Sequence, residues 1–179
     1  MAAVDDLSQF TGLAPLFPLP DVVLFPHMSL PLHIFEERYR QLLADALAGG
    51  RWLALALLKP GWEPHYLGRP DIHEMVCLGR ISAAEKLSSG RSNIVLTGLQ
   101  RAVVVQEQCN ELPYRVAQLE LYQDFYHRAP PVRRDIRKQE LLLHYRKLFP
   151  ASHADGLFSQ VLATDIPLGV ICDLFGSSL

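Results

Sequence analysis

The chain has 179 residues, of which 49% are hydrophobic and 20% charged, and its formal net charge is -2. A chain of this length can bury a real core, and the composition is typical of a soluble globular protein with one domain and a smaller extension. The nearly neutral charge excludes a global attraction to nucleic acid or to acidic lipid.

Targeting and cysteine signals indicate a cytoplasmic protein. The N-terminus, MAAVDDLSQF, carries two aspartates where a signal peptide carries positive charge, and no apolar run of membrane-spanning length follows it. Cys77, Cys109 and Cys172 lie far apart and form no CxxC pair. We therefore expect buried thiols in a reducing compartment and no membrane association.

The stretch LFPLPDVVLFPHMSLPLHIFEERYRQLL, residues 16–43, is apolar and repeatedly interrupted by proline. Because proline donates no ladder hydrogen bond, short strands at edges and corners fit this stretch better than a central strand. From Glu36 to Ala48 the apolar residues recur at helical spacing, and Gly49-Gly50 supplies a stop. This second segment therefore predicts a helix.

The next segments alternate between strand and loop patterns. Residues 51–58, RWLALALL, are short and apolar, which predicts a strand buried on both faces. Residues 59–71 are rich in proline, glycine and aromatic side chains, which predicts a long ordered loop.

Residues 72–122 contain four short β-type runs, HEMVCLGRISAAEKL, SNIVLTG, RAVVVQEQ and YRVAQLELY. The turn between the first two is expected at Ser88-Ser89-Gly90, and Gly79 and Gly98 are expected to mark bends or bulges. Several short strands and one helix predict an α+β fold with a small closed or half-closed barrel.

After Tyr122 the composition shifts, because QDFYHRAPPVRRD contains two adjacent prolines and the remainder carries helical patterns. We expect helices over residues 136–149, from Ser152 through Val161, and after Pro167. In the last helix, one face is predicted to carry Leu168, Ile171, Cys172 and Phe175.

These patterns predict a domain organisation. We expect an N-terminal extension at 1–12, a barrel domain at 13–123, a linker at 124–133 and a C-terminal helical subdomain at 134–179. If Phe175 and Leu179 lack a cover within the chain, the C-terminal helices would support a homodimer.

The proline-rich opening resembles a known family. The run PLFPLPDVVLFPHMSLPLHIFEERYR, residues 15–40, is similar to the start of the Lon substrate-binding domain, the N-terminal module of ATP-dependent Lon proteases that also occurs in stand-alone bacterial proteins. Looser agreement continues through residues 51–58, Gly79-Arg80-Ile81, Gly98 to Arg101, and Pro113-Tyr114-Arg115. The resemblance implies a PUA-like β pseudo-barrel with one packed helix and a C-terminal helical extension, which engages substrate polypeptide.

Motifs for catalysis are missing from this sequence. It contains no GxxxxGK[ST] phosphate loop and no GxSxG nucleophile motif. We expect a binding module without enzymatic activity, lacking the ATPase and protease domains of Lon proteases, with no cofactor and no metal. A metal cluster of His65, His73 and Cys77 is disfavoured, because Cys77 stands where HExxH requires its second histidine.

Seven residues are candidates for contact with polypeptide: Phe25, His33, Glu36, Arg38, Trp62, His65 and Tyr66. For the Glu36 and Arg38 pair, a solvated helix face is the competing interpretation. The loop aromatics are either anchors for a partner or a lid over a barrel end. For His33, a structural imidazole hydrogen-bonded to backbone carbonyls that the prolines leave unpaired is favoured over proton transfer.

The leading hypothesis is a protein-binding module for exposed apolar segments of unfolded or partner polypeptides, with a separate protease or chaperone as a further candidate partner. The alternative is RNA binding through the basic C-terminal helices, although nucleic acid is the less favoured partner. The basic residues in question are Arg128, Arg133, Arg134, Arg137, Lys138, Arg146 and Lys147.

Overall fold

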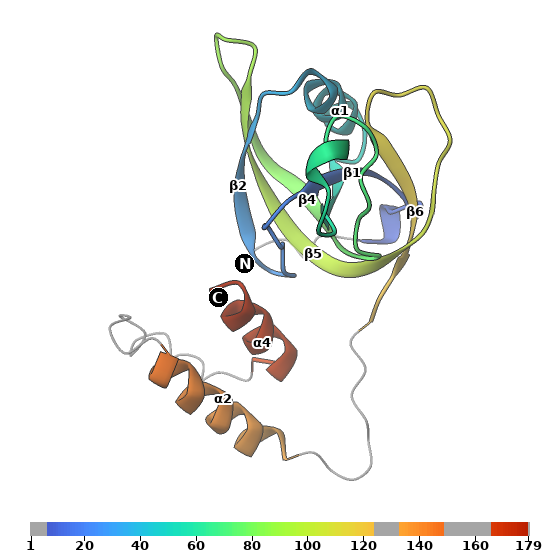
Figure 1. Ribbon diagram of the computed structural model, residues 1–179. Coiled ribbons are helices and arrows are strands. Elements are labelled where there is room, and N and C mark those ends of the chain that lie inside the picture. Colours follow the sequence, from blue (N-terminus) through green and yellow to red (C-terminus); the bar gives the residue numbers. More distant parts are fainter. Residues whose placement is uncertain (1–6, 124–132, 149–165, 179) are drawn as a thin grey trace. The chain divides into compact units, whose positions relative to one another are not determined.

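The computed structural model describes residues 7–123, 133–148 and 166–178 (Figure 1). The chain divides into two compact units, Met1–Gln123 and Asp124–Leu179. The helix expected from Ser152 through Val161 and nearly all of the linker expected at 124–133 lie outside the described residues. The finer domain boundaries stay a prediction.

One curved sheet forms the first unit. Its six strands are β1 (Leu13–Leu19), β2 (Ser29–Ile34), β3 (Trp52–Leu57), β4 (Met75–Lys86), β5 (Ser92–Glu107) and β6 (Arg115–Leu121). The order is β2-β5-β4-β3-β1-β6, and an additional β5–β6 pairing closes the last five strands into a ring (Figure 1). The predicted α+β pseudo-barrel is confirmed.

The prolines of β1 lie inside the strand order rather than at an edge, so this part of the prediction was wrong. Strand β1 lies between β3 and β6, but the two partners hold different halves of it. Pro15 is opposite Val116 of β6, Pro18 is opposite Ala56 of β3, and only Leu16 is paired on both sides. Each proline therefore has a ladder on one side only, which is the condition that an edge strand would provide.

Strand β5 unites two runs that the sequence predicted as separate strands. Cross-strand partners Gly79 and Gly98 sit at a register shift between β4 and β5, and a bulge there bends the strand without ending it. The hairpin turn at residues 88–90 is confirmed by hydrogen bonds between Leu87 and Gly90 and between Leu87 and Arg91.

Two apolar clusters occupy the two faces of the sheet. In β3, Leu53 and Leu55 belong to the first cluster, whereas Trp52, Ala54 and Ala56 belong to the second, so the strand is buried on both faces as predicted. Burial on both faces explains why its sequence lacks polar alternation.

Helix α1 (Glu37–Ala48) packs on the first cluster through Tyr39, Leu42, Leu43 and Ala46, which confirms the predicted helix. The second cluster is covered by a short 3-10 helix, η1 (Leu7–Gln9), with Phe10 after it, and by the 59–71 loop with its own 3-10 helix, η2 (Glu63–His65).

The described part of the second unit consists of α2 (Arg134–Leu148) and α4 (Leu168–Gly176). Leu142, Ile171 and Phe175 are buried together, and the Tyr145 and Phe175 rings stack with centroids 4.0 Å apart. Phe175 is therefore buried within the chain and does not support the predicted homodimer. Leu179 lies outside the described residues.

The three cysteines form no disulfide in the described ranges, and only Cys77 is buried. Cys109 lies in the exposed connection between β5 and β6, and Cys172 lies on the outer side of α4 rather than on its predicted apolar face. The prediction of buried thiols was wrong for these two. Among the described helices, none combines the length and the apolar character needed to cross a membrane.

Candidate functional site

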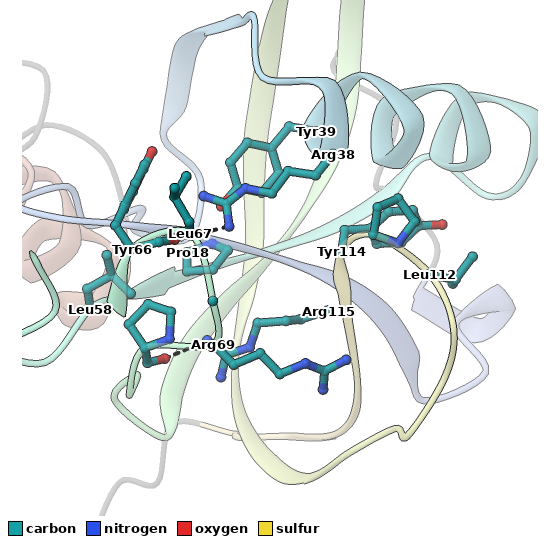
Figure 2. Close-up of a pocket in the computed structure, with 13 residues that line it drawn as sticks. Pro18, Arg38, Tyr39, Leu58, Tyr66, Leu67, Arg69, Leu112, Tyr114 and Arg115 are labelled. Carbon is teal, nitrogen blue, oxygen red and sulfur yellow. Dashed lines mark hydrogen bonds between the residues drawn. The ribbon is translucent and has the colours of Figure 1, made fainter. Parts of the chain in front are cut away.

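A cavity of about 240 Å³ opens at the start of helix α1 (Figure 2). Three segments that are distant in the sequence build most of its wall: the first turn of α1, the 66–70 part of the long loop, and the 112–115 segment that leads into β6. The lining residues are Pro18, Arg38, Tyr39, Leu58, Tyr66, Leu67, Gly68, Arg69, Pro70, Leu112, Pro113, Tyr114 and Arg115.

Arg38 fastens the long loop to the helix. Its Nη1 donates to the Tyr66 carbonyl oxygen at 3.1 Å, and its Nε donates to Glu36 Oε2 at 3.0 Å. The Tyr66 hydroxyl donates to the other Glu36 oxygen at 2.5 Å. The guanidinium carbon also lies 4.6 Å from the Tyr39 ring centroid and 5.0 Å from the Tyr66 centroid, in cation–π range.

Burial controls the ionisation of the two tyrosines beside Arg38. Burial raises the pKa of Tyr39 to about 12, and the nearby Arg38 charge opposes this rise only in part. Burial and the hydrogen bond to Glu36 raise the pKa of Tyr66. Both phenols are therefore neutral at physiological pH, and the Tyr66 hydroxyl stays available as a donor to Glu36.

Arg115 occupies the opposite side of the cavity and is 8% exposed (Figure 2). Its Nε donates to Glu107 Oε2 at 2.8 Å, its Nη2 pairs with Glu107 Oε1, and its Nη1 donates to the Pro70 carbonyl oxygen at 2.7 Å. Because the bond to Pro70 crosses between segments, it holds the end of the long loop against β6. Arg69 is half-exposed, with Nη1 3.9 Å from Glu107 Oε2.

Tyr114 holds the third lining segment, residues 112–115, against helix α1. Its hydroxyl donates to Asp45 Oδ2 of α1 at 2.6 Å, and burial with this bond raises its pKa above the usual value for tyrosine. The segment that carries Leu112 and Pro113 is therefore held close to α1.

A second, wider concavity of about 860 Å³ lies between α1 and the end of the β4–β5 hairpin. Leu43, Ala44 and Leu47 line it from the helix, and the end of the β4–β5 hairpin lines it from the other side. Leu112 and Pro113 line both concavities, so the two adjoin at this segment. We call the combined surface the α1 groove.

Of the seven predicted contact residues, the structure brings Glu36, Arg38 and Tyr66 together at the cavity. Trp62 is next to them, with its ring centroid 5.4 Å from that of Tyr66, but it packs half-buried on the second cluster, as the lid interpretation expects. His65 is exposed at the end of η2 and does not line the cavity. Binding roles for these residues stay a prediction.

Phe25 and His33 lie away from this cavity. Phe25 is in the β1–β2 connection, where its carbonyl oxygen accepts from the Met28 N–H at 3.2 Å. His33 Nδ1 lies 2.8 Å from Asn93 Oδ1 across the β2–β5 ladder, and its ring stacks on Phe35. The partner of His33 is therefore a side-chain oxygen of the neighbouring strand, not the backbone carbonyl that the structural interpretation expected.

Sequence reasoning did not identify Leu67, Arg69, Leu112 or Arg115 as site residues. A signal existed for Arg115, because Pro113-Tyr114-Arg115 belongs to the resemblance to the Lon domain. The others lie in loops whose position relative to α1 depends on the tertiary hydrogen bonds described above.

The metal hypothesis is not supported. In the described ranges, no group of three or more histidine, cysteine, aspartate or glutamate side chains could hold a metal ion. Cys77 is buried within β4, whereas His65 and His73 are exposed.

Comparisons with known proteins agree with the fold. Residues 14–164 match the family model of the ATP-dependent protease La (LON) substrate-binding domain. The chain is 28% identical over 106 residues to the Lon protease of Heliobacterium modesticaldum, covering 59% of this chain and 13% of that protein. It is 26% identical over 190 residues to Lon protease 2 of Bdellovibrio bacteriovorus, covering 100% of this chain and 22% of that protein.

Two solved structures share the fold. The N-terminal domain of Mycobacterium avium complex Lon protease superposes with a TM-score of 0.68 at 14% identity, covering 92% of this chain and 81% of that one. A Lon N-terminal domain protein from Xanthomonas campestris gives a TM-score of 0.54 at 22% identity, covering 92% of this chain and 97% of that one.

Proposed function

This chain belongs to the Lon substrate-binding domain family, and from that premise we propose that it binds exposed apolar segments of unfolded or partner polypeptides in the α1 groove. The proposed role is recognition without catalysis, because the family match is to the substrate-binding domain. A separate protease or chaperone that receives the bound polypeptide is part of the same proposal.

The observation that carries the proposal is the shared wall at Leu112 and Pro113. Because both concavities meet there, an extended chain could occupy the smaller cavity and continue past Leu112 and Pro113 into the larger one. Extended peptides gain affinity from backbone hydrogen bonds and specificity from pockets for alternate side chains. A groove with two adjoining hollows suits this mode of recognition.

The chemistry of the groove also supports an apolar segment. Leu67 is 89% exposed and Leu112 is 42% exposed, and both line the smaller cavity. Two exposed leucines that line one cavity form apolar surface that a partner can cover. Half-buried Leu47 continues this surface along the second concavity. Affinity for an unfolded partner should be modest, because the partner loses conformational entropy when it is ordered.

Replacing Leu67 and Leu112 together with serine should weaken binding of a permanently unfolded, fluorescently labelled polypeptide about tenfold, as expected if each leucine contributes about 0.7 kcal/mol of partial burial. Fluorescence anisotropy at low and high salt is the measurement. Wild-type binding should lose much less affinity with salt than phosphate binding does, because apolar contacts are not screened.

Leu13→Ser is the matched control, since Leu13 is 43% exposed but lines neither concavity. Its affinity should equal that of the wild type. Equal losses in both variants would contradict the groove as the site. Salt-sensitive binding to a structured RNA, without polypeptide binding, would replace the proposal with the basic-helix alternative.

A further inference from the structure

The charged side chains that line the smaller cavity are all positive. Its thirteen lining residues include three arginines, Arg38, Arg69 and Arg115, and no aspartate or glutamate. The carboxylates that pair with them, Glu36 and Glu107, are not among the lining residues. Figure 2 shows Arg38 on one side of the cavity and Arg69 and Arg115 on the other.

The two bonded guanidinium groups retain hydrogen-bonding capacity. Each guanidinium carries five N–H donors. Arg38 bonds through Nε, Nη1 and Nη2 to Glu36 and Tyr66, and Arg115 bonds through the same three atoms to Glu107 and Pro70. Within the described part of the chain, the second hydrogen on each Nη therefore has no partner. These bonds also hold both guanidinium groups in fixed orientations.

The charge balance favours a singly charged ligand. The three lining arginines and the two glutamates that pair with them carry a net charge of 3 - 2 = +1. A carboxylate carries one negative charge and matches the planar guanidinium fork, whereas a phosphate monoester carries nearly two. At about 240 Å³, the cavity is also smaller than the usual small-molecule pocket, and it suits one terminal group rather than a whole cofactor.

Apolar side chains surround this cationic site. Leu67 and Leu112 line the cavity with their exposed side chains, and the Tyr39 and Tyr66 rings lie beside Arg38. We propose that this cavity recognises a carboxylate that a bound polypeptide carries next to an apolar side chain. This inference rests on the proposed function and gives it a chemical preference. The carboxylate would come from the C-terminus of a polypeptide or from an acidic side chain.

Four labelled peptides of one apolar sequence test the proposal by fluorescence anisotropy. The first ends in a free carboxylate, the second in an amide, and the third and fourth are amides with an internal glutamate or glutamine. A charge-assisted hydrogen bond predicts about tenfold tighter binding of the first peptide than of the second. If acidic side chains are the source, the third will bind about tenfold tighter than the fourth instead.

In the Arg69→Gln variant, the affinity for the preferred acidic peptide should lie within about twofold of the affinity for its neutral counterpart. Arg69 suits the test because its side chain is 49% exposed and its ion pair with Glu107 is long, at 3.9 Å, so the fold should survive its replacement. Arg51→Gln removes an equal charge at an exposed position outside the cavity and should keep the full preference.

Equal binding of the acidic and neutral peptides would overturn the carboxylate site and leave the proposed function standing. An acid preference that survives Arg69→Gln would overturn the assignment to this cavity. Failure of all four peptides and of the unfolded polypeptide would overturn the proposed function as well.

Discussion

Gly98→Ala should lower the free energy of unfolding of the barrel by about 3 kcal/mol or more, since overpacking against backbone is at the upper end of such costs. A Cβ at Gly98 would lie 2.2 Å from the Phe25 carbonyl oxygen and 3.0 Å from its carbon. The contact cannot relax easily. The Gly98 N–H donates to Met28 and its carbonyl accepts from His27, both at 2.8 Å.

Urea unfolding followed by tryptophan fluorescence is the measurement, because both tryptophans of the chain, Trp52 and Trp62, lie in the barrel unit. Gly49→Ala is the control: its Cβ would meet only ordinary contacts, the nearest 3.5 Å away, and its φ is -105°. This variant should stay within about 0.5 kcal/mol of the wild type. An equally small change in the free energy of unfolding for Gly98→Ala would mean that the β1–β2 connection does not pack closely against Gly98.

Alkaline pH should destabilise the barrel, by about 2 kcal/mol between pH 10 and pH 12 from Tyr39 alone. The pKa of Tyr39 is raised from 10.0 to about 12 by burial. In this window the unfolded chain releases the proton and the folded chain keeps it. The stabilising effect is therefore complete below pH 10 and is lost as pH rises through the folded pKa. The pKa values of Tyr66 and Tyr114 are raised too, which acts in the same direction.

Urea titrations at several pH values test this dependence, with tyrosinate absorbance as a second signal. Tyr39→Phe keeps a ring against Phe17, whose centroid lies 4.6 Å away, and removes the titrating group. The variant should lose stability less steeply, by about 1.4 kcal/mol per pH unit, which corresponds to one proton. An unchanged slope would show that Tyr39 is not held neutral by burial.

Much of the fold follows from local sequence patterns. The helix at α1, the doubly buried strand β3 and the 88–90 turn were predictable, because each depends on periodicity, glycine or apolar length within a few residues. The prolines of β1 were assigned to an edge strand because a proline cannot donate a hydrogen bond to a neighbouring strand. The local sequence does not show that β3 and β6 each pair with a different half of β1.

The candidate site was only partly predictable. Glu36, Arg38 and Tyr66 were identified from one motif and one aromatic loop, and the structure brings them into contact. Arg115 joins the site through a bond to Pro70, which lies 45 residues away in the sequence. Such a contact depends on the pairing of β6 with β1, which places Arg115 opposite Leu16, and no local pattern encodes it.

The central claim is that a polypeptide binds along the α1 groove. Amide hydrogen exchange of the full chain, with and without a saturating unfolded polypeptide, tests this claim most directly. We expect slowed exchange in residues 38–47, 66–70 and 112–115, which build the groove. Slowed exchange confined to β2, or to the α2 helix, would contradict it.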